Sequence, residues 1–577
     1  MKSSRPGKPN TRALTLLWLV LFAAALAFSL WKLPYGFGGS DEGFYLTVAH
    51  RLSLGDSLFA DEWHLSQLLS FFLWPFVKLY TSVTGSTEGI MLASRYLYLA
   101  MHALVSAVIY LRLRKFGLMA AIASVLYLIY TPFDMMTMSY NTIALDMLAL
   151  TGVLLGAAGE RDWLSWLLGG ISFACAVVCC PYLALVYVVF ALAAVAFIMP
   201  GLRKYAGFGF FTARNFRYLT LGILIPFALF VVFFFFHSDL SRLAANLPGI
   251  LSDPEHPSYS MWFMAKHYVY CIVTAHRYIL LPIGLYALHL LLMLLDKKRG
   301  TRRDLHFAFA MLCSALCFAL FIPRLSEEYF NAVAFPMAFA GFTAYVLLEK
   351  KPVKLFISAF LLGICYSVCV SSTSNMGFLV ISMAFSVVNL ASLVFIGLFV
   401  KENSADGKHH TRSFAVAMLT LLFAAMLIYS KAEHCFWDGA PSQLRSEIAS
   451  GPAKGIVTSA GLEESYRSIY EDMQGYKELE RDELLVMSQI PWCYLIAEDY
   501  PYGSFSAWLS GLDESTVDRL ELYYSANPQK IPQYIYIVKS NNFGPLFLQH
   551  DEIMDGAKTH GYSVEENDVS YKLQKLG

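Results

Sequence analysis

Two adjacent carboxylates, Asp41 and Glu42, follow the first long apolar run of the chain. A carboxylate in that position can act as the general base for an acceptor hydroxyl, which needs a proton acceptor as it attacks. The alternative is structural, because Ser40 or Asp41 can cap a following helix and acidic residues suit its first turn. The pair therefore predicts either a catalytic centre, with Asp41 and Glu42 as its residues, or a helix cap.

A second polar group follows in the same segment, where Asp61 and His64 are three residues apart with Glu62 between them. A helix would bring residues at this spacing to one face. Carboxylate oxygens and an imidazole can together hold a divalent metal ion. We therefore expect Glu62 and His64 as metal ligands, with a divalent metal as the only cofactor to consider; a solvated helix start is the alternative.

Two arginines stand at the mouths of apolar runs, Arg95 in the second run and Arg324 after the ninth. The planar guanidinium fork suits a phosphate, although an arginine there can also extend its charge to lipid headgroups. Asp146 is predicted about one turn inside the fourth run, where an acidic residue is costly. Asp146, Glu327 and Tyr329 are the candidates for substrate binding.

The composition predicts a membrane protein. The chain has 577 residues, of which 57% are hydrophobic and 15% charged, against roughly 25% charged in an ordinary soluble domain. Apolar runs long enough to cross a hydrocarbon core of about 30 Å recur along the first 430 residues. We expect a polytopic α-helical membrane protein with about thirteen transmembrane helices, at 13–33, 92–111, 118–133, 142–158, 164–180, 182–199, 218–237, 268–295, 305–322, 331–348, 353–371, 377–399 and 413–430.

Lysine and arginine gather in alternate loops, as expected when those loops are cytoplasmic. This distribution predicts a cytoplasmic N-terminus and places loop 34–91 and residues 431–577 outside the membrane. The formal net charge is zero, which excludes the basic footprint of a nucleic-acid-binding protein. The basic loops are 1–12, 112–115, 161, 203–217, 297–303, 350–354 and 401–412.

The chain divides into a membrane domain, 1–430, and a polar C-terminal domain, 431–577. Loop 34–91 is too long for a simple connector, and its apolar pattern predicts two interfacial helices, at 41–54 and 63–84. The C-terminal domain alternates β-rich runs with helical stretches, as in an extracytoplasmic α/β domain. Its expected strands are 455–458, 484–488 and 534–538, and its expected helices 462–475 and 514–526.

Ten cysteines are present, and eight of them fall in the expected spans, where they act as small packing residues. Cys435 and Cys493 lie outside the spans. They can pair in an oxidising exterior or remain free thiols, because their separation in space does not follow from the sequence.

In this order and topology the motifs resemble the GT-C superfamily, the polytopic glycosyltransferases that use a polyprenyl-phosphate sugar. Protein O-mannosyltransferases and the lipid A aminoarabinose transferase belong to it. The resemblance covers most of residues 13–350. Its motifs are Asp41-Glu42-Gly43-Phe44-Tyr45, Leu54-Gly55-Asp56, the set Gly85, Glu88 and Arg95 before and within the second span, Asp146 in the fourth, and Tyr329 with Pro336.

By this resemblance Asp41 would be the catalytic base, Arg95 and Arg324 would hold the lipid phosphate, and Glu62 would lie near the metal or donor. The expected reaction moves a sugar, with inversion, from a polyprenyl-phosphate donor to an extracytoplasmic hydroxyl of a cell-envelope glycan, lipid or protein. The expected location is the plasma membrane, with the lipid bilayer as a partner and no nucleic acid. The alternatives are a transporter or flippase for a lipid-linked sugar, and a non-catalytic membrane scaffold.

Overall fold

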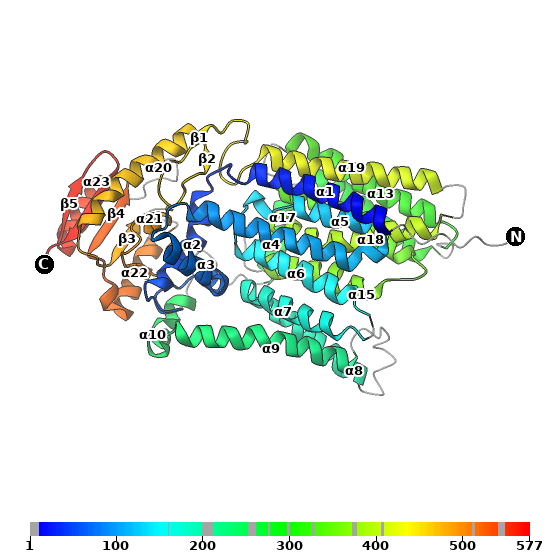
Figure 1. Cartoon of the computed structure of the whole chain (residues 1–577), viewed down its shortest axis with the longest axis horizontal. Helices are drawn as coiled ribbons and strands as arrows, with labels where there is room; N and C mark the ends of the chain where they lie inside the picture. The colour runs from blue at the N-terminus through cyan, green and yellow to red at the C-terminus, as the bar shows by residue number, and fades with distance from the viewer. Residues whose placement is uncertain are drawn as a thin grey trace.

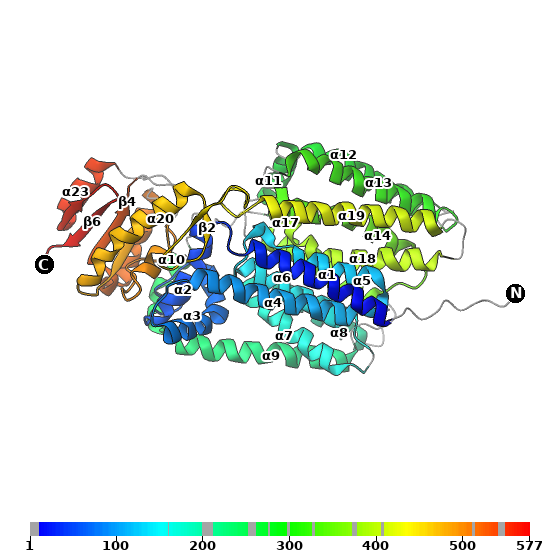
Figure 2. The ribbon, with the colours of Figure 1, turned by 45° about the horizontal axis from the view of Figure 1, so that its top comes forward.

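The structure is a computed structural model of the whole chain, a long helical bundle with a mixed α/β region packed against one end (Figure 1). We call that end of the bundle the domain end and the opposite end the distal end. The first described helix, Thr11–Lys32, begins at the distal end, and the C-terminus lies in the α/β region (Figures 1 and 2). The structure describes residues 11–159, 161–198, 212–251, 261–274, 277–296, 300–325, 329–371, 378–404, 409–487, 489–509, 514–539 and 549–577.

Within these residues eight helices are long and apolar enough to cross a membrane. Each of the other expected spans coincides with a shorter apolar helix, so a multi-pass helical bundle is observed while the number thirteen is not established. The eight are Thr11–Lys32, Ile90–Phe116, Ala213–Phe236, Arg277–Leu295, Arg303–Phe321, Val353–Ser371, Phe385–Glu402 and His410–Glu433. The shorter five are Leu118–Asp134, Tyr140–Gly156, Trp163–Cys179, Pro181–Leu192 and Asn331–Leu347.

The helices of the bundle carry the following labels. They are α1 (Thr11–Lys32), α4 (Ile90–Leu113), α5 (Leu118–Ile129), α6 (Tyr140–Gly156), α7 (Trp163–Cys179), α8 (Ala184–Ile198), α9 (Ala213–Phe236), α12 (Leu280–Leu295), α13 (Arg303–Phe321), α14 (Met337–Leu347), α15 (Val353–Leu355), the π-helical η8 (Phe356–Leu361), α16 (Leu362–Ser371), α17 (Phe378–Met383), α18 (Phe385–Glu402) and α19 (His409–Glu433). Helices α10 (Leu240–Leu251) and α11 (Met261–Thr274) lie between α9 and α12 in the chain.

Several basic residues of the loops predicted as cytoplasmic meet at the distal end. Arg112 donates to Asp162 at 2.7 Å, and Lys115 donates to the carbonyl of Ala157 at 2.7 Å. These contacts lie far from the α/β region, which is joined to the opposite end of the bundle (Figure 1). The basic loop 112–115 therefore packs against residues 157–162 at this end of the bundle.

Loop 34–91 forms α2 (Gly39–Ser53), the 3₁₀ helix η1 (Leu65–Leu69) and α3 (Ser70–Thr84). Both expected helices are present in outline, but α2 is buried over most of its length between the bundle and the α/β region. A Cβ at Gly43 would lie only 2.9 Å from the Cβ of Trp492, so a larger residue there would displace the α/β region. Because both partners cover α2, it is a core helix of the domain end, in contrast to the interfacial helix expected from its pattern.

The α/β region contains a four-stranded sheet in the order β3-β4-β6-β5. Strands β3 and β4 are parallel, while β4 with β6 and β6 with β5 are antiparallel. The expected strands and helices lie within a few residues of the observed ones. The elements are β1 (Ser446–Glu447), β2 (Val457–Thr458), α20 (Ala460–Met473), β3 (Leu484–Met487), α21 (Cys493–Ile496), α22 (Glu514–Ala526), β4 (Tyr534–Val538), α23 (His550–His560), β5 (Tyr562–Glu566) and β6 (Ser570–Lys575).

Cys435 and Cys493 are both free thiols, so the disulfide considered from the sequence is not formed. Cys435 lies against the ammonium of Lys32, with Nζ and Sγ 3.0 Å apart. Cys493 is fully buried in α21. The two side chains are thus separately packed, one at the end of the bundle and one inside the α/β region.

Candidate functional site

The first turn of α2 carries Asp41 and Glu42, and the two carboxylates have different surroundings. Glu42 is 2% exposed and accepts two hydrogen bonds from Arg95 of α4, from Nε to Oε1 at 2.7 Å and from Nη2 to Oε2 at 2.6 Å. Such a two-pronged pair is strong and geometrically specific. It fixes the start of α2 against the bundle.

The remaining donors of Arg95 reach backbone carbonyls of the turn that leads into α2. They contact the carbonyl oxygens of Leu33 at 2.9 Å, Tyr35 at 3.3 Å and Gly36 at 2.6 Å. The guanidinium is thereby committed to Glu42 and to this turn. To bind a phosphate, as the sequence predicts, Arg95 would have to give up these contacts, and the geometry instead favours a positioning role.

Asp41 is only partly covered, and its environment suits a proton acceptor. Of the structural alternative, the side-chain cap is not observed, because α2 begins at Gly39 and no side chain caps it, whereas both carboxylates do lie in its first turn. Burial raises the pKa of Asp41 to about 6, and a hydrogen bond with the side chain of Trp437 opposes that rise. A base whose pKa lies near the working pH transfers protons efficiently. These surroundings leave Asp41 a candidate for general-base chemistry.

Trp437 itself is unusual. It is 70% exposed and its φ is 55°, a left-handed backbone conformation that a bulky residue rarely adopts. Such strain persists only where surrounding contacts enforce it, and it concentrates at functional sites. The neighbouring residue Phe436 lies beside Gly38, where a Cβ would approach its ring to 2.8 Å. The 436–437 segment thus covers the turn that begins α2.

A buried cluster of charges lies next to this turn at the domain end. Lys32 at the end of α1 and Lys431 near the end of α19 are 1% and 2% exposed, and Asp134 is 8% exposed. Both ammonium groups interact electrostatically with Asp134, while within the described residues neither forms a salt bridge. We call Lys32, Lys431 and Asp134 the lysine cluster. Two cations facing one anion leave a net positive charge suited to an anionic ligand.

The hydrogen bonds of the lysine cluster are to uncharged groups. Lys431 donates to the carbonyl of Ile129 at 2.9 Å and to Oγ1 of Thr131 at 3.1 Å. Lys32 donates to the carbonyl of His434 and contacts Cys435. One carboxylate oxygen of Asp134, Oδ2, is buried without a hydrogen-bond partner. The cluster is consequently a polar pocket whose charge is not neutralised internally.

A small cavity joins the lysine cluster to the start of α2. Lys32, Asp134, Glu42 and Arg95 all line it. Asp134 follows Phe133, and both residues have φ above 50°, in the left-handed region. Oδ1 of Asn331 accepts from the backbone N–H of Phe133 at 2.9 Å and stabilises this turn. The cavity therefore connects the charged pocket with the residue next to Asp41.

The sequence did not identify Lys32 and Lys431 as site residues. A signal was present, because each lysine ends an apolar run at a membrane face where the charge distribution predicts few basic residues. Asp134 was recognisable only as an acidic residue beside a span. The three residues come together only through tertiary packing, because α1, the turn after α5 and α19 are distant in the sequence.

Three other predicted site residues lie at or near the gaps in the description. The backbone of Arg324 belongs to η6 (Ile322–Arg324), and the next residue, Leu325, accepts a hydrogen bond from His434 through its carbonyl. This contact brings η6 close to the lysine cluster. Tyr329 begins η7 (Tyr329–Ala334), and Glu327 lies outside the described residues.

Asp146 lies inside the bundle and is 1% exposed. Its Oδ1 is 2.7 Å from Nδ1 of His102 and accepts from the hydroxyl of Tyr127 at 2.9 Å. The other oxygen, Oδ2, has no hydrogen-bond partner. These contacts account for a buried acid within the helices, and no contact joins Asp146 to the lysine cluster directly.

Glu62 and His64 do not form a metal site in this geometry. The oxygens of Glu62 accept from Arg51 at 2.8 Å and from the backbone N–H groups of His64 at 3.1 Å and Ala507 at 3.0 Å. Nδ1 of His64 lies 2.6 Å from Oγ of Ser66. Across the residues that the structure describes, no group of three metal-binding side chains is found. The ligands expected from the sequence thus do not fit a metal ion here.

The contacts of Glu62 belong to a buried ionic network that joins loop 34–91 to α10 and to the α/β region. Arg51 donates to Asp56 at 2.6 Å, Lys530 pairs with Asp56, and Arg242 pairs with Asp61 through Nη1 to Oδ2 at 3.0 Å. We call this set the loop network, and its three basic and three acidic members balance. Its members are Arg51, Asp56, Asp61, Glu62, Arg242 and Lys530.

No family model matches the chain, and no curated protein matches it. Among solved structures it is similar to ArnT from Cupriavidus metallidurans bound to undecaprenyl phosphate, with 13% identity over 97% of this chain and 98% of that chain and a TM-score of 0.49. It is also similar to the archaeal oligosaccharyltransferase AglB from Archaeoglobus fulgidus in complex with an inhibitory peptide and a dolichol-phosphate. That match has 12% identity over 90% of this chain and 69% of that chain, with a TM-score of 0.45.

Similarity at this level carries no argument about activity. The functional argument therefore rests on the residues of this chain.

Proposed function

We propose that this protein is an integral-membrane glycosyltransferase that moves a sugar from a polyprenyl-phosphate donor to a hydroxyl of a cell-envelope acceptor. The observation that carries the proposal is the lysine cluster, a buried group with a net positive charge. Its members Lys32 and Asp134 line a small cavity together with Glu42, the residue next to Asp41. A pocket of this kind suits a phosphate, and the adjacent carboxylate suits a base. The donor class is the one that the resemblance of the sequence implies.

In the proposed reaction Asp41 accepts the proton of the acceptor hydroxyl as its oxygen attacks the anomeric carbon of the sugar. The bond between that carbon and the phosphate oxygen breaks, and the polyprenyl phosphate leaves with the electron pair. Lys32 and Lys431 stabilise the negative charge that develops on the leaving phosphate, and Arg324 is the further candidate in the same place. Pre-positioned charge of this kind is commonly the largest contribution to catalysis.

Glu42 and Arg95 have a positioning role in this proposal. Their two-pronged pair holds the first turn of α2, so that Asp41 is presented at a fixed place beside the cavity. Trp437 lies close to Asp41 and opposes the rise of its pKa. In the predicted topology this end of the bundle faces the outside of the plasma membrane, where an envelope acceptor is available.

The test uses purified protein in lipid nanodiscs with radiolabelled polyprenyl-phosphate hexoses and extracted cell envelope. We expect Asp41→Asn to reduce transfer of label by about 10²- to 10⁴-fold, the usual contribution of a general base. Glu88→Gln is the matched control, because Glu88 lies in the same loop and forms an exposed pair with Lys454. Equal transfer by Asp41→Asn and Glu88→Gln would contradict the role of Asp41. An intact donor with every sugar tried would contradict a transferase and favour transport of the lipid-linked sugar.

A further inference from the structure

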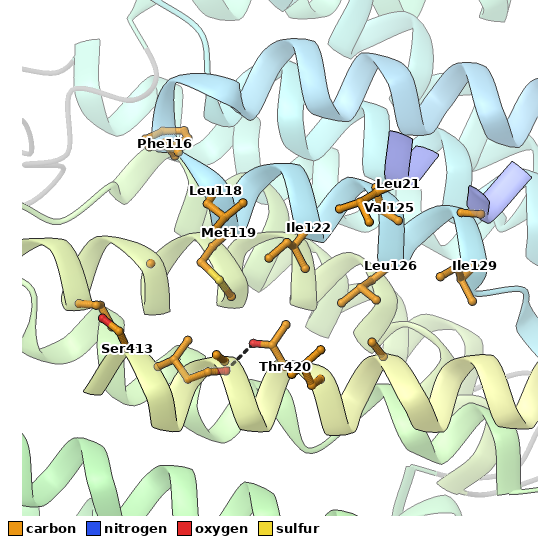
Figure 3. Close-up of a pocket in the computed structure, with 18 of the residues that line it drawn as sticks. Leu21, Phe116, Leu118, Met119, Ile122, Val125, Leu126, Ile129, Ser413 and Thr420 are labelled. Atoms are coloured by element: carbon orange, nitrogen blue, oxygen red, sulfur yellow. Dashed lines mark hydrogen bonds between the residues drawn. The ribbon is translucent and has the colours of Figure 1, made fainter. Parts of the chain in front are cut away.

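Exposed apolar side chains occur on the spans and also outside them. Within the bundle they line a groove between α1, α5, α18 and α19, where Met119, Ile122 and Leu126 point into the space in front of α19 (Figure 3). Such side chains are expected on a helix that crosses the bilayer. Helix α10 is different, because its 12 residues are only about 18 Å long at 1.5 Å per residue and cannot cross a hydrocarbon core of about 30 Å.

One face of α10 is an exposed apolar stripe. Leu240, Leu247 and Leu251 are 54%, 48% and 77% exposed, and Ala244 is also exposed. These positions are separated by four, three and four residues, a spacing that places them on one side of a helix. Exposed apolar patches of this kind mark surfaces that meet a membrane or another protein.

The opposite face of α10 packs against the protein. Arg242 pairs with Asp61, with Nη1 and Oδ2 3.0 Å apart, and Oδ1 of Asn246 accepts from Nε1 of Trp63 at 3.0 Å. Gly249 lies against the same indole ring, which a Cβ at that position would overlap. These contacts fix the rotation of α10 about its axis, and the apolar stripe consequently points away from the protein.

A short connection joins α10 to a span. Helix α9 is one of the eight candidate spans, and its last residues, Phe235 and Phe236, are 62% and 81% exposed. Only residues 237–239 separate the two helices, so α10 begins at most about 14 Å from the end of the span. Oδ1 of Asp239 accepts from the backbone N–H of Ser241 at 2.9 Å and so holds the turn at the start of α10. The exposed apolar residues of α9 and α10 thus follow one another along the chain at the domain end (Figures 1 and 2).

We propose that α10 lies flat in the interfacial layer of the bilayer at the domain end, with its apolar stripe toward the acyl chains. An amphipathic helix in this position buries its apolar face about 5–10 Å into the boundary between headgroups and acyl chains. A lipid surface is the partner that the structure favours, because the stripe begins where a span ends. The inner face of α10 then ties Asp61 and Trp63 to the membrane surface. This anchor does not depend on the proposed transfer reaction.

The test places a nitroxide spin label on α10 of the full-length protein in phosphatidylglycerol and phosphatidylethanolamine nanodiscs. Ala244→Cys puts the label on the stripe, and Ala245→Cys, at an exposed position outside the stripe, is the matched control. Collisions with oxygen, which concentrates in lipid, and with a neutral nickel chelate, which remains in water, distinguish the two surroundings. The described native cysteines are buried or partly buried, and unsubstituted protein labelled in parallel supplies the background.

We expect the ratio of oxygen to nickel accessibility to be several times higher at position 244 than at position 245, because only position 244 faces lipid. Equal ratios would overturn the proposal. So would free access of nickel to position 244, which would show that the stripe lies in water. Low access of both reagents to position 244 would also overturn it, since the stripe would then be covered by protein.

A second pair of labels tests whether the helix lies flat. Leu240→Cys and Leu251→Cys stand at the two ends of the stripe, about 16 Å apart at 1.5 Å per residue. We expect both labels at a similar depth, whereas a helix upright in the membrane would separate their depths by most of this length. Lipid contact at position 240 together with water contact at position 251 would contradict the flat orientation, because the helix would then leave the surface after its first turn.

Discussion

Two buried clusters of charge stand close to α2, and they differ in how their charges are balanced. In the loop network each side chain has a partner of opposite sign, as in the pair of Arg51 with Glu62 at 2.8 Å. In the lysine cluster Lys32 and Lys431 share the single carboxylate of Asp134 and donate mainly to uncharged groups. The loop network joins parts of the fold, whereas the lysine cluster keeps a net positive charge that Asp134 alone does not neutralise.

This difference separates buried charged residues that have a structural role from buried charged residues that have a functional role. A buried ion that is fully paired is explained by the fold, and removing its partner destabilises the protein. A buried ion without a counter-ion lowers stability by itself, so its presence points to a ligand that supplies the missing charge. The predictions below test this contrast.

The largest expected effect is the loss of Arg51. Arg51→Met leaves Asp56 and Glu62 buried without this partner, and we expect the free energy of unfolding to fall by about 3–5 kcal/mol. Thermal unfolding in detergent, followed by tryptophan fluorescence, measures the change. Lys454→Met, which breaks an exposed pair with Glu88, is the control. A melting temperature shared by the two variants would remove the structural role assigned to the loop network.

The opposite behaviour is expected of Lys431. Lys431→Met should bind undecaprenyl phosphate about 10- to 100-fold more weakly, because one charge-assisted hydrogen bond contributes about 1.5–3 kcal/mol. Its melting temperature should be unchanged or higher, because an apolar side chain replaces an unneutralised buried charge. Loss of stability together with unchanged binding would show that the lysine cluster resembles the loop network after all.

Asp41 should give a stability effect of opposite sign to that of Arg51. Its folded-state pKa of about 6 lies above the ordinary value of 3.8, so between these values the folded protein holds a proton that the unfolded chain has lost. Stability therefore falls as pH rises through this window, and the full penalty is present above about pH 6. Asp41→Asn should be more stable than wild type at pH 8 and similar to it at pH 4. Identical melting temperatures at both values would argue against the raised pKa.

The pH profile of transfer gives a smaller effect. In the proposed mechanism Asp41 accepts a proton only when ionised, so activity should rise through about pH 6. Trp437→Phe removes the hydrogen bond that lowers the pKa of Asp41, and the midpoint of the profile should move to higher pH. Transfer measured from pH 5 to pH 8 tests this shift. A midpoint unaffected by Trp437→Phe would separate Trp437 from the titration of Asp41.

The smallest effect belongs to the exposed pair of Lys454 and Glu88, whose nitrogen and oxygen are 3.0 Å apart. We expect Lys454→Met to change the free energy of unfolding by about 0.5 kcal/mol or less, since exposed ion pairs are weak. The same melting experiment measures it. A larger loss would mean that this contact between loop 34–91 and residues after α19 is a structural support comparable to the loop network.

Sequence reasoning succeeded where local pattern decides the structure. The apolar runs coincide with helices of the bundle, and the β-rich run 534–538 is β4 in full. Asp41 and Glu42 were predicted to act as a pair, yet their surroundings differ because packing of α4 brings Arg95 to Glu42 alone. From the sequence alone, the guanidinium of Arg95 suggests a phosphate ligand. The fold shows that it is bound instead to the carboxylate of Glu42.

The lysine cluster was beyond local reasoning for the same physical cause. Lys32 contacts residues 434 and 435, at the other end of the membrane-spanning part of the chain. Burial of a lysine at the end of a span depends on which helices surround it. A lysine that extends to lipid headgroups and a lysine buried among helices can have the same local sequence, so the sequence alone does not distinguish them.

The cover over α2 is made by residues that follow the membrane helices in the chain. Trp492 presses on Gly43, the backbone of Ala507 holds Glu62, and Lys530 pairs with Asp56. A ribosome that has completed the membrane helices has therefore not yet supplied these contacts. The turn that carries Asp41 would acquire its final shape only when residues 492 to 530 have been translated and have reached the same end of the bundle.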